Sequence, residues 1–127
     1  MTNWLWVALG GAAGSVARYG LGVQAGRWLG SGWPYGTFIA NVVGGLLLGL
    51  LAGWLAHRGG ADQERWRLLL GVGLLGGFTT FSAFSLETAG MIQRGDWGGA
   101  LGYAGLSAVL SVAAVFAGLM LARGAFA

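Results

Sequence analysis

Hydroxyl and amide side chains stand out in this mostly apolar sequence. Tyr103, Ser107 and Ser111 follow one another at intervals of four residues, so a helix would align them on one face. Asn41 adds an amide in an earlier apolar stretch. Such groups donate and accept hydrogen bonds, so they could line a path for an ion of either sign. Single serines in membrane helices often bond the preceding turn instead, and that alternative stays open here.

The stretch GGFTTFSAF, from Gly76 to Phe84, combines residues that weaken a helix with aromatic side chains. Gly76 and Gly77 each lower helix propensity by about 1 kcal/mol relative to alanine, so the helix is expected to open here. Carbonyls freed by such a break must be buried or line a cavity, where they could hold a cation. Phe81 and Phe84 would share a helix face. Their electropositive ring edges could favour an anion, with ordinary aromatic packing as the alternative.

Two ionisable side chains, Arg18 and Glu87, fall within apolar stretches. A charge in the lipid core costs about 2.5–3.5 kcal/mol on insertion scales, so such groups face the protein interior or water. Arg18 could anchor helix packing or extend toward the membrane surface. Glu87 lies within two turns of the end of its stretch and could sit in a wet vestibule.

The elements that must position these residues are membrane helices. The chain has 127 residues, of which 56% are hydrophobic and only 9% are charged, whereas a soluble domain carries roughly 25% charged residues. Four apolar stretches are each long enough to cross about 30 Å of hydrocarbon. The composition therefore predicts an all-α integral membrane protein of one domain, 1–127, with spans at about 4–26, 36–57, 66–93 and 97–123.

The same composition argues against other classes of protein. The chain has no cysteine and a single histidine, His57, so a thiolate metal site or a histidine-centred enzyme is not expected. Its net charge of +3 comes from arginines that lie mostly near the ends of the predicted spans. This distribution indicates contact with a membrane surface and not with nucleic acid.

Glycines recur every fourth residue in the first two predicted spans. Small residues at this spacing let helix backbones approach closely in lipid, so we expect both rows to lie at helix contacts. The rows are Gly10, Gly14, Gly22 and Gly26 in the first span, and Gly45, Gly49 and Gly53 in the second.

The loop arginines give only a weak signal for orientation. Four of them fall on one predicted side (Arg58, Arg65, Arg67 and Arg123) and two on the other (Arg27 and Arg94). A small protein with so little bias can insert in both orientations. The pattern therefore permits an antiparallel dimer without requiring one.

Three stretches together resemble the small fluoride channels of the Fluc (CrcB) family. They are GGAAGSVARY at 10–19, GTFIANVVGGLLLG at 36–49, and GGFTTFSAF at 76–84. The resemblance covers almost the whole chain. It implies an antiparallel, dual-topology homodimer in the plasma (inner) membrane, with two pores built from both subunits. It also implies passive export of cytoplasmic fluoride, which relieves fluoride toxicity, and no enzymatic activity.

The resemblance also implies roles for individual residues. Asn41 would be the amide of the pore, and the ring edges of Phe81 and Phe84 would meet fluoride. The remaining polar residues would line the path (Thr80, Ser82, Tyr103, Ser107 and Ser111), hold a central structural sodium ion through backbone carbonyls (Gly76 and Thr79), or serve in a vestibule or in structure (Arg18 and Glu87). One departure is Ala83, where the family often carries serine or threonine.

Two other classes of function remain as alternatives. A small proton-coupled multidrug transporter also has four short spans, but it needs a carboxylate within the membrane, usually in the first span. Here only Glu87 could serve, and it lies late in the third. A membrane scaffold without transport activity would leave the aligned polar residues unexplained.

Overall fold

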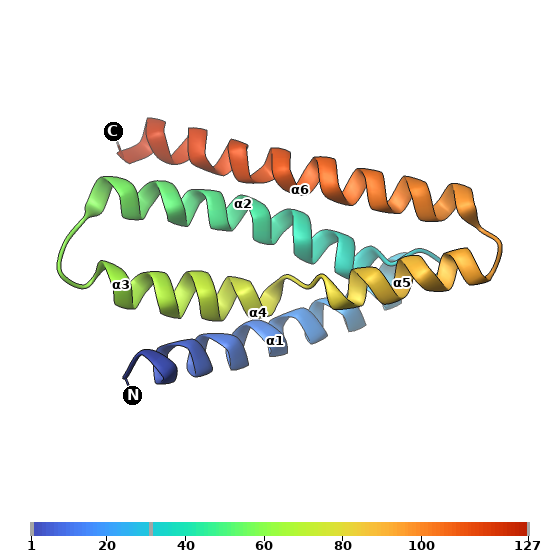
Figure 1. Ribbon diagram of the computed structural model, residues 1–127, viewed down its shortest axis with the longest axis horizontal. Helices are drawn as coiled ribbons and strands as arrows, with labels where there is room; N and C mark the ends of the chain where they lie inside the picture. Colours follow the sequence, from blue (N-terminus) through green and yellow to red (C-terminus); the bar gives the residue numbers. More distant parts are fainter. Residues whose placement is uncertain (1, 31, 127) are drawn as a thin grey trace.

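Long helices form almost the entire chain in the computed structural model, which describes residues 2–30 and 32–126 (Figure 1). Helix α1 spans Thr2–Leu29, α2 spans Tyr35–Arg58 and α6 spans Trp97–Phe126. Between α2 and α6 lies a third, interrupted segment. The predicted domain also includes residues 1, 31 and 127, which lie outside the described residues.

The third segment consists of four helical pieces. They are α3 (Gln63–Trp66), a π-helix η1 (Arg67–Leu75), α4 (Gly76–Phe78) and α5 (Ser82–Gln93). The chain leaves the helix at Thr79, whose ψ of 157° is extended, and α5 begins after Phe81. A broken third helix is therefore confirmed.

The position of the break differs from the prediction. Gly76 and Gly77 lie within α4, so the chain opens after the glycines and not at them. A side chain at Gly77 would lie 2.8 Å from the carbonyl oxygen of Gly11 on α1. The low helix propensity of Gly77 is thus tolerated because its missing side chain lets the two helices touch.

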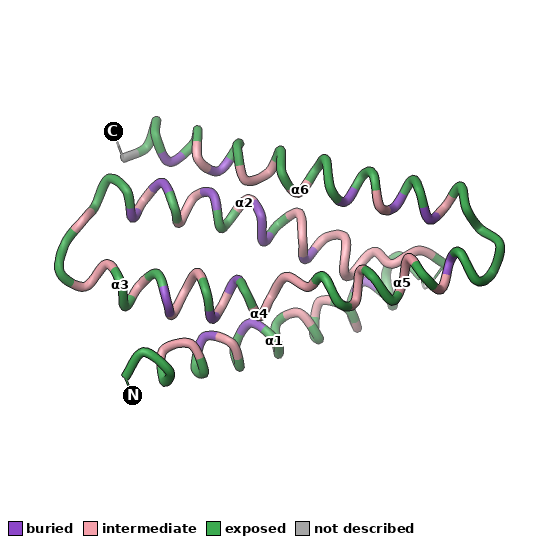
Figure 2. Tube along the Cα trace, in the orientation of Figure 1, coloured by how far each residue is buried: buried purple, intermediate pink, exposed green. Residues whose placement is uncertain are grey.

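The helices pack in two pairs that run side by side. Helix α2 lies along α6, and α1 lies along η1 and α4 (Figure 1). The N-terminal end of α1, the α2–α3 loop and the C-terminal end of α6 share one end of the molecule. Buried residues face the neighbouring helices, while the outer faces of α1 and α6 are largely exposed (Figure 2).

Most of the predicted glycine rows do form helix contacts. An added Cβ would overlap backbone atoms of the third segment at Gly10 and Gly14, and backbone atoms of α6 at Gly45 and Gly49. At Gly53 it would overlap the Ala122 side chain of α6. Gly22 lies close to Gly36 of α2. A Cβ added at Gly36 would be 2.8 Å from the Gly22 Cα atom. The prediction is wrong for Gly26, which meets nothing within 4 Å among the described residues, because the buried Ala25, one position earlier, lies next to Gly36 of α2 instead.

The contact at Gly14 makes a quantitative prediction for stability. Gly14→Ala is expected to lower the free energy of unfolding by about 1–3 kcal/mol, because its Cβ would overlap the Leu74 carbonyl oxygen and lie 2.8 Å from the Phe78 nitrogen. The control is Gly20→Ala, whose Cβ meets no atom of the described part of the chain within 4 Å. That variant should be neutral or stabilised by up to about 1 kcal/mol. Thermal unfolding in detergent, followed by circular dichroism, measures both, and equal midpoints would contradict the assignment.

Within residues 2–30 and 32–126, three helical segments are long and apolar enough to cross a membrane by length and composition. They are Tyr35–Arg58, Gln63–Gln93 and Trp97–Ala125. Helix α1, the predicted first span, has 28 residues, which is about 42 Å of helix. It falls outside this set because glycines and polar residues, including Arg18 and Gln24, dilute its apolar content.

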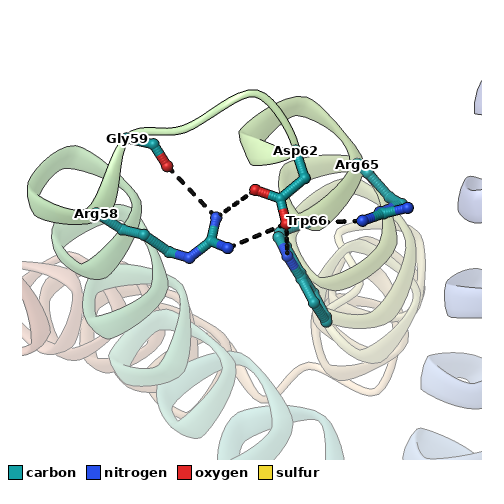
Figure 3. Close-up of polar contacts among 5 residues, drawn as sticks. All are labelled: Arg58, Gly59, Asp62, Arg65 and Trp66. Carbon is teal, nitrogen blue, oxygen red and sulfur yellow. Dashed lines mark hydrogen bonds and ion pairs between the residues drawn. The ribbon is translucent and has the colours of Figure 1, made fainter.

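A compact charged cluster closes the α2–α3 loop (Figure 3). Arg58 donates to both carboxylate oxygens of Asp62, at 2.7 and 3.0 Å, and the Trp66 indole N–H donates to Asp62 Oδ2 at 3.0 Å. Arg65 approaches the same oxygen at 3.6 Å. Hydrogen bonds from Arg58 and Trp66 hold the pKa of the Asp62 carboxyl well below its usual range. Asp62 therefore stays ionised at neutral pH and links α2 to α3.

Candidate functional site

The break in the third segment is held by a side chain from α2. The Asn41 amide forms two hydrogen bonds with the backbone of Thr80, which lies 39 residues further along the chain. Its Nδ2 donates to the Thr80 carbonyl oxygen at 3.2 Å, and its Oδ1 accepts from the Thr80 N–H at 2.9 Å. Asn41 thus pairs both backbone groups of a residue that has left the helix.

A third hydrogen bond supports the start of the helix beyond the break. The Thr80 hydroxyl oxygen accepts from the Ala83 N–H at 3.2 Å and lies 3.2 Å from the Ser82 hydroxyl. The N–H groups in the first turn of a helix have no partner within the helix, and this bond satisfies one of them in α5. Thr80 therefore stabilises the first turn of α5 with its side chain, while Asn41 pairs its backbone.

The hydrogen bonds made by Asn41 and by the Thr80 hydroxyl leave the carbonyls of Gly76 and Thr79 without their usual helical donors. In an uninterrupted helix, the Thr80 N–H would donate to the Gly76 carbonyl and the Ala83 N–H to the Thr79 carbonyl. Both N–H groups donate to side-chain oxygens instead. Gly76 and Thr79 line a cavity of about 350 Å³ next to Asn41. Carbonyls at the C-terminal end of a broken helix can coordinate a sodium ion, so the carbonyls of Gly76 and Thr79 fit that ion.

Phe81 and Phe84 continue into a row of aromatic rings. Their centroids are 5.5 Å apart, and the Phe84 ring lies 5.2 Å from that of Tyr103 on α6. Tyr103 is completely buried, and the Trp33 ring packs against it in a T-shaped arrangement, with a centroid distance of 5.1 Å. Phe81, by contrast, is 78% exposed. The Tyr103 end of this row is therefore buried in the core, and the Phe81 end is exposed.

The predicted hydroxyls of α6 face the same place. Ser107 and Ser111 line a cavity of about 230 Å³ together with Asn41, Phe81 and Phe84. The hydroxyl oxygens of both serines are buried, and no described residue offers either of them a hydrogen bond. The preceding-turn alternative is thus wrong for both. Unpaired buried hydroxyls cost free energy, so a bound ion or water is expected at this position.

Tyr103 belongs to the same row but plays a different structural part. Its hydroxyl is also buried without a partner among the described residues. Its ring, however, packs between Phe84 and Trp33 and forms a hydrophobic cluster with Met91 and Ala100. Tyr103 therefore holds the Phe84 ring in place by packing against it.

Arg18 and Glu87 lie away from the serine cavity and are not paired with each other. Arg18 lines a cavity of about 280 Å³ between α1 and α2, and Glu87 lines neighbouring cavities of about 240 and 310 Å³. The Arg18 Nε and Glu87 Oε1 atoms are buried without a partner among the described residues. Thr37 lines a cavity with each of them.

Sequence reasoning missed Thr37 and Trp33. Thr37 lies four residues before Asn41, so extending the Asn41 row by one turn would have found it. Trp33 precedes the only proline, near an expected span end, where tryptophan is commonly interfacial. Its packing on Tyr103 depends on a contact between residues 70 positions apart, which no local pattern reveals.

The fold and these cavities define a multi-pass membrane protein whose broken helix opens onto an internal polar site. A family model described as "CrcB-like protein, Camphor Resistance (CrcB)" matches residues 5–119. Since the match covers most of the chain, the chain belongs to this family.

Curated relatives agree over the full length of the chain. A "Fluoride-specific ion channel FluC" from Phenylobacterium zucineum is 71% identical over 97% of both chains. Proteins with the same description from Caulobacter sp. (strain K31) and Caulobacter vibrioides are 67% and 62% identical, the latter over 100% of both chains. These relatives are described as channels and not as enzymes.

Proposed function

We propose that this chain forms a passive, fluoride-selective channel that lets fluoride leave the cytoplasm. The observation that carries this proposal is the cavity in which the unpaired hydroxyls of Ser107 and Ser111 face the rings of Phe81 and Phe84. A small anion that loses its water needs hydrogen-bond donors, which the hydroxyls supply. It is also attracted to the positive edge of an aromatic ring. The relatives described as fluoride channels point to the same anion.

The channel is proposed to be a dimer of oppositely inserted copies in the inner membrane. Phe81 lines the cavity yet is 78% exposed, so the single chain leaves that wall open. A second copy laid against this face would close the wall and give two equivalent pathways. The weak arginine bias of the loops is compatible with insertion in both orientations.

A structural sodium ion is proposed at the centre of that dimer. The carbonyls of Gly76 and Thr79, which have lost their helical donors, would hold it. When bound, it would supply a fixed positive charge near the break. Asn41 and Thr80 would keep the two carbonyls available by engaging the N–H groups that a helix would otherwise give them.

Efflux from liposomes tests the proposed function. Purified protein in vesicles loaded with potassium fluoride should release fluoride quickly once valinomycin allows potassium to follow, as measured with a fluoride electrode. Vesicles loaded with potassium chloride should retain chloride. Release should not require a proton gradient, which separates a channel from a proton-coupled transporter. Equal chloride and fluoride fluxes would reject the selectivity, and dependence on a proton gradient would reject passive conduction.

A further inference from the structure

Gly44 of α2 lies against Thr79, the first residue of the break. It follows Asn41 by three residues, so both lie on nearly the same face of α2. A Cβ added at Gly44 would overlap the Thr79 methyl group and lie 3.4 Å from the Phe78 ring. Gly44 and Thr79 both line the larger cavity, of about 350 Å³. Glycine is thus the residue that lets the Thr79 methyl group reach α2.

The Thr79 side chain cannot turn aside freely. Its hydroxyl donates to the Leu75 carbonyl oxygen at 3.0 Å, and its N–H donates to the same oxygen at 2.9 Å. Threonine has few χ1 rotamers, so turning the methyl group away would also move the hydroxyl from Leu75. A side chain at residue 44 would therefore shift the Thr79 backbone or sacrifice this hydrogen bond.

We propose that Gly44 is a positioning residue of the channel, acting through Thr79. Gly44 leaves room for the Thr79 methyl group to pack against α2, and Asn41 pairs the backbone of Thr80. Two residues on one face of α2 thus hold two successive residues of the break. The position of the Thr79 carbonyl, and of the Phe81 ring two residues later, follows from this contact. This inference rests on the proposed function, because it assigns Gly44 a part in fluoride conduction.

A double-mutant cycle tests the contact. Gly44→Ala is expected to lower fluoride efflux by about tenfold or more, since a displacement on the order of 1 Å at a functional group has effects of this size. Thr79→Ser removes the overlapping methyl group and keeps the hydroxyl. In that background, Gly44→Ala should lower efflux by less than about twofold, because contacting residues are energetically coupled.

The control is Gly98→Ala near the start of α6, where an added Cβ meets nothing within 4 Å among the described residues. Its efflux should equal that of the wild type. An equal loss from Gly44→Ala in both backgrounds, or no loss in either, would overturn the proposal. If Gly44→Ala alone does not fold, the double variant should fold, and failure of both would also overturn it.

The cycle separates this inference from the proposed function. If the wild-type protein passes no fluoride, the proposed function fails. The same four proteins, compared by thermal unfolding, still show whether Gly44 and Thr79 are coupled. If the wild type conducts and the unfolding midpoints are additive, the contact is absent and only the inference fails.

Discussion

Phe84→Ile is expected to lower fluoride efflux by at least about tenfold, the factor that corresponds to a loss of roughly 1.4 kcal/mol. Phe84 lies between the rings of Phe81 and Tyr103 and lines the serine cavity. Isoleucine keeps an apolar side chain there but has no electropositive ring edge to offer an anion. Phe81→Ile should have an effect of the same kind. Efflux from liposomes measures both.

The matched control for these variants is Phe116→Ile. Phe116 lies on α6, is 62% exposed and lines none of the cavities described above. This variant should conduct like the wild type. All three proteins should elute from a sizing column at the wild-type position, which shows that assembly is intact. Wild-type efflux from both Phe81→Ile and Phe84→Ile would refute the aromatic assignment.

Asn41→Leu is expected to remove efflux and to destabilise the protein as well. Leucine has the branching and the number of heavy atoms of asparagine but leaves the N–H and carbonyl of Thr80 unpaired. Each unpaired group of this kind costs about 1–3 kcal/mol when buried. Since the site is only partly buried, we expect a total loss of about 2 kcal/mol in the free energy of unfolding. Thermal unfolding and fluoride efflux measure the two effects separately.

Asn41→Asp separates the contribution of the amide to stability from its contribution to fluoride efflux. An aspartate can still accept from the Thr80 N–H, but its second oxygen would face the Thr80 carbonyl oxygen without a proton to donate, so only one of the two hydrogen bonds should return. Its negative charge beside the cavity would repel an anion, so efflux should stay low. Asn3→Leu, at an exposed position near the N-terminus, is the control and should change neither quantity. If Asn41→Leu conducts normally, the pore assignment is wrong; if it unfolds at the wild-type temperature, the pairing with Thr80 contributes nothing to stability.

The row of hydroxyls on α6 could be predicted because a helix has a fixed period. Tyr103, Ser107 and Ser111 needed only one uninterrupted helix to share a face, and the long apolar stretch around them ensured it. The position of the break was harder to predict. Gly76 and Gly77 marked the correct segment through their low helix propensity, but propensity is a weak signal that tertiary contacts override. Contact with α1 keeps Gly77 helical, and the chain opens at Thr79.

The sequence by itself determined that this is a membrane protein of long helices, which residues share a helix face, and which family its motifs resemble. Those properties depend on composition and on neighbours within a few residues. Only the tertiary structure decided that the Asn41 amide pairs the backbone of Thr80. The tertiary structure also placed Gly44 against Thr79. Such contacts join residues far apart in the chain, and they exist only once α2 has packed beside the broken helix.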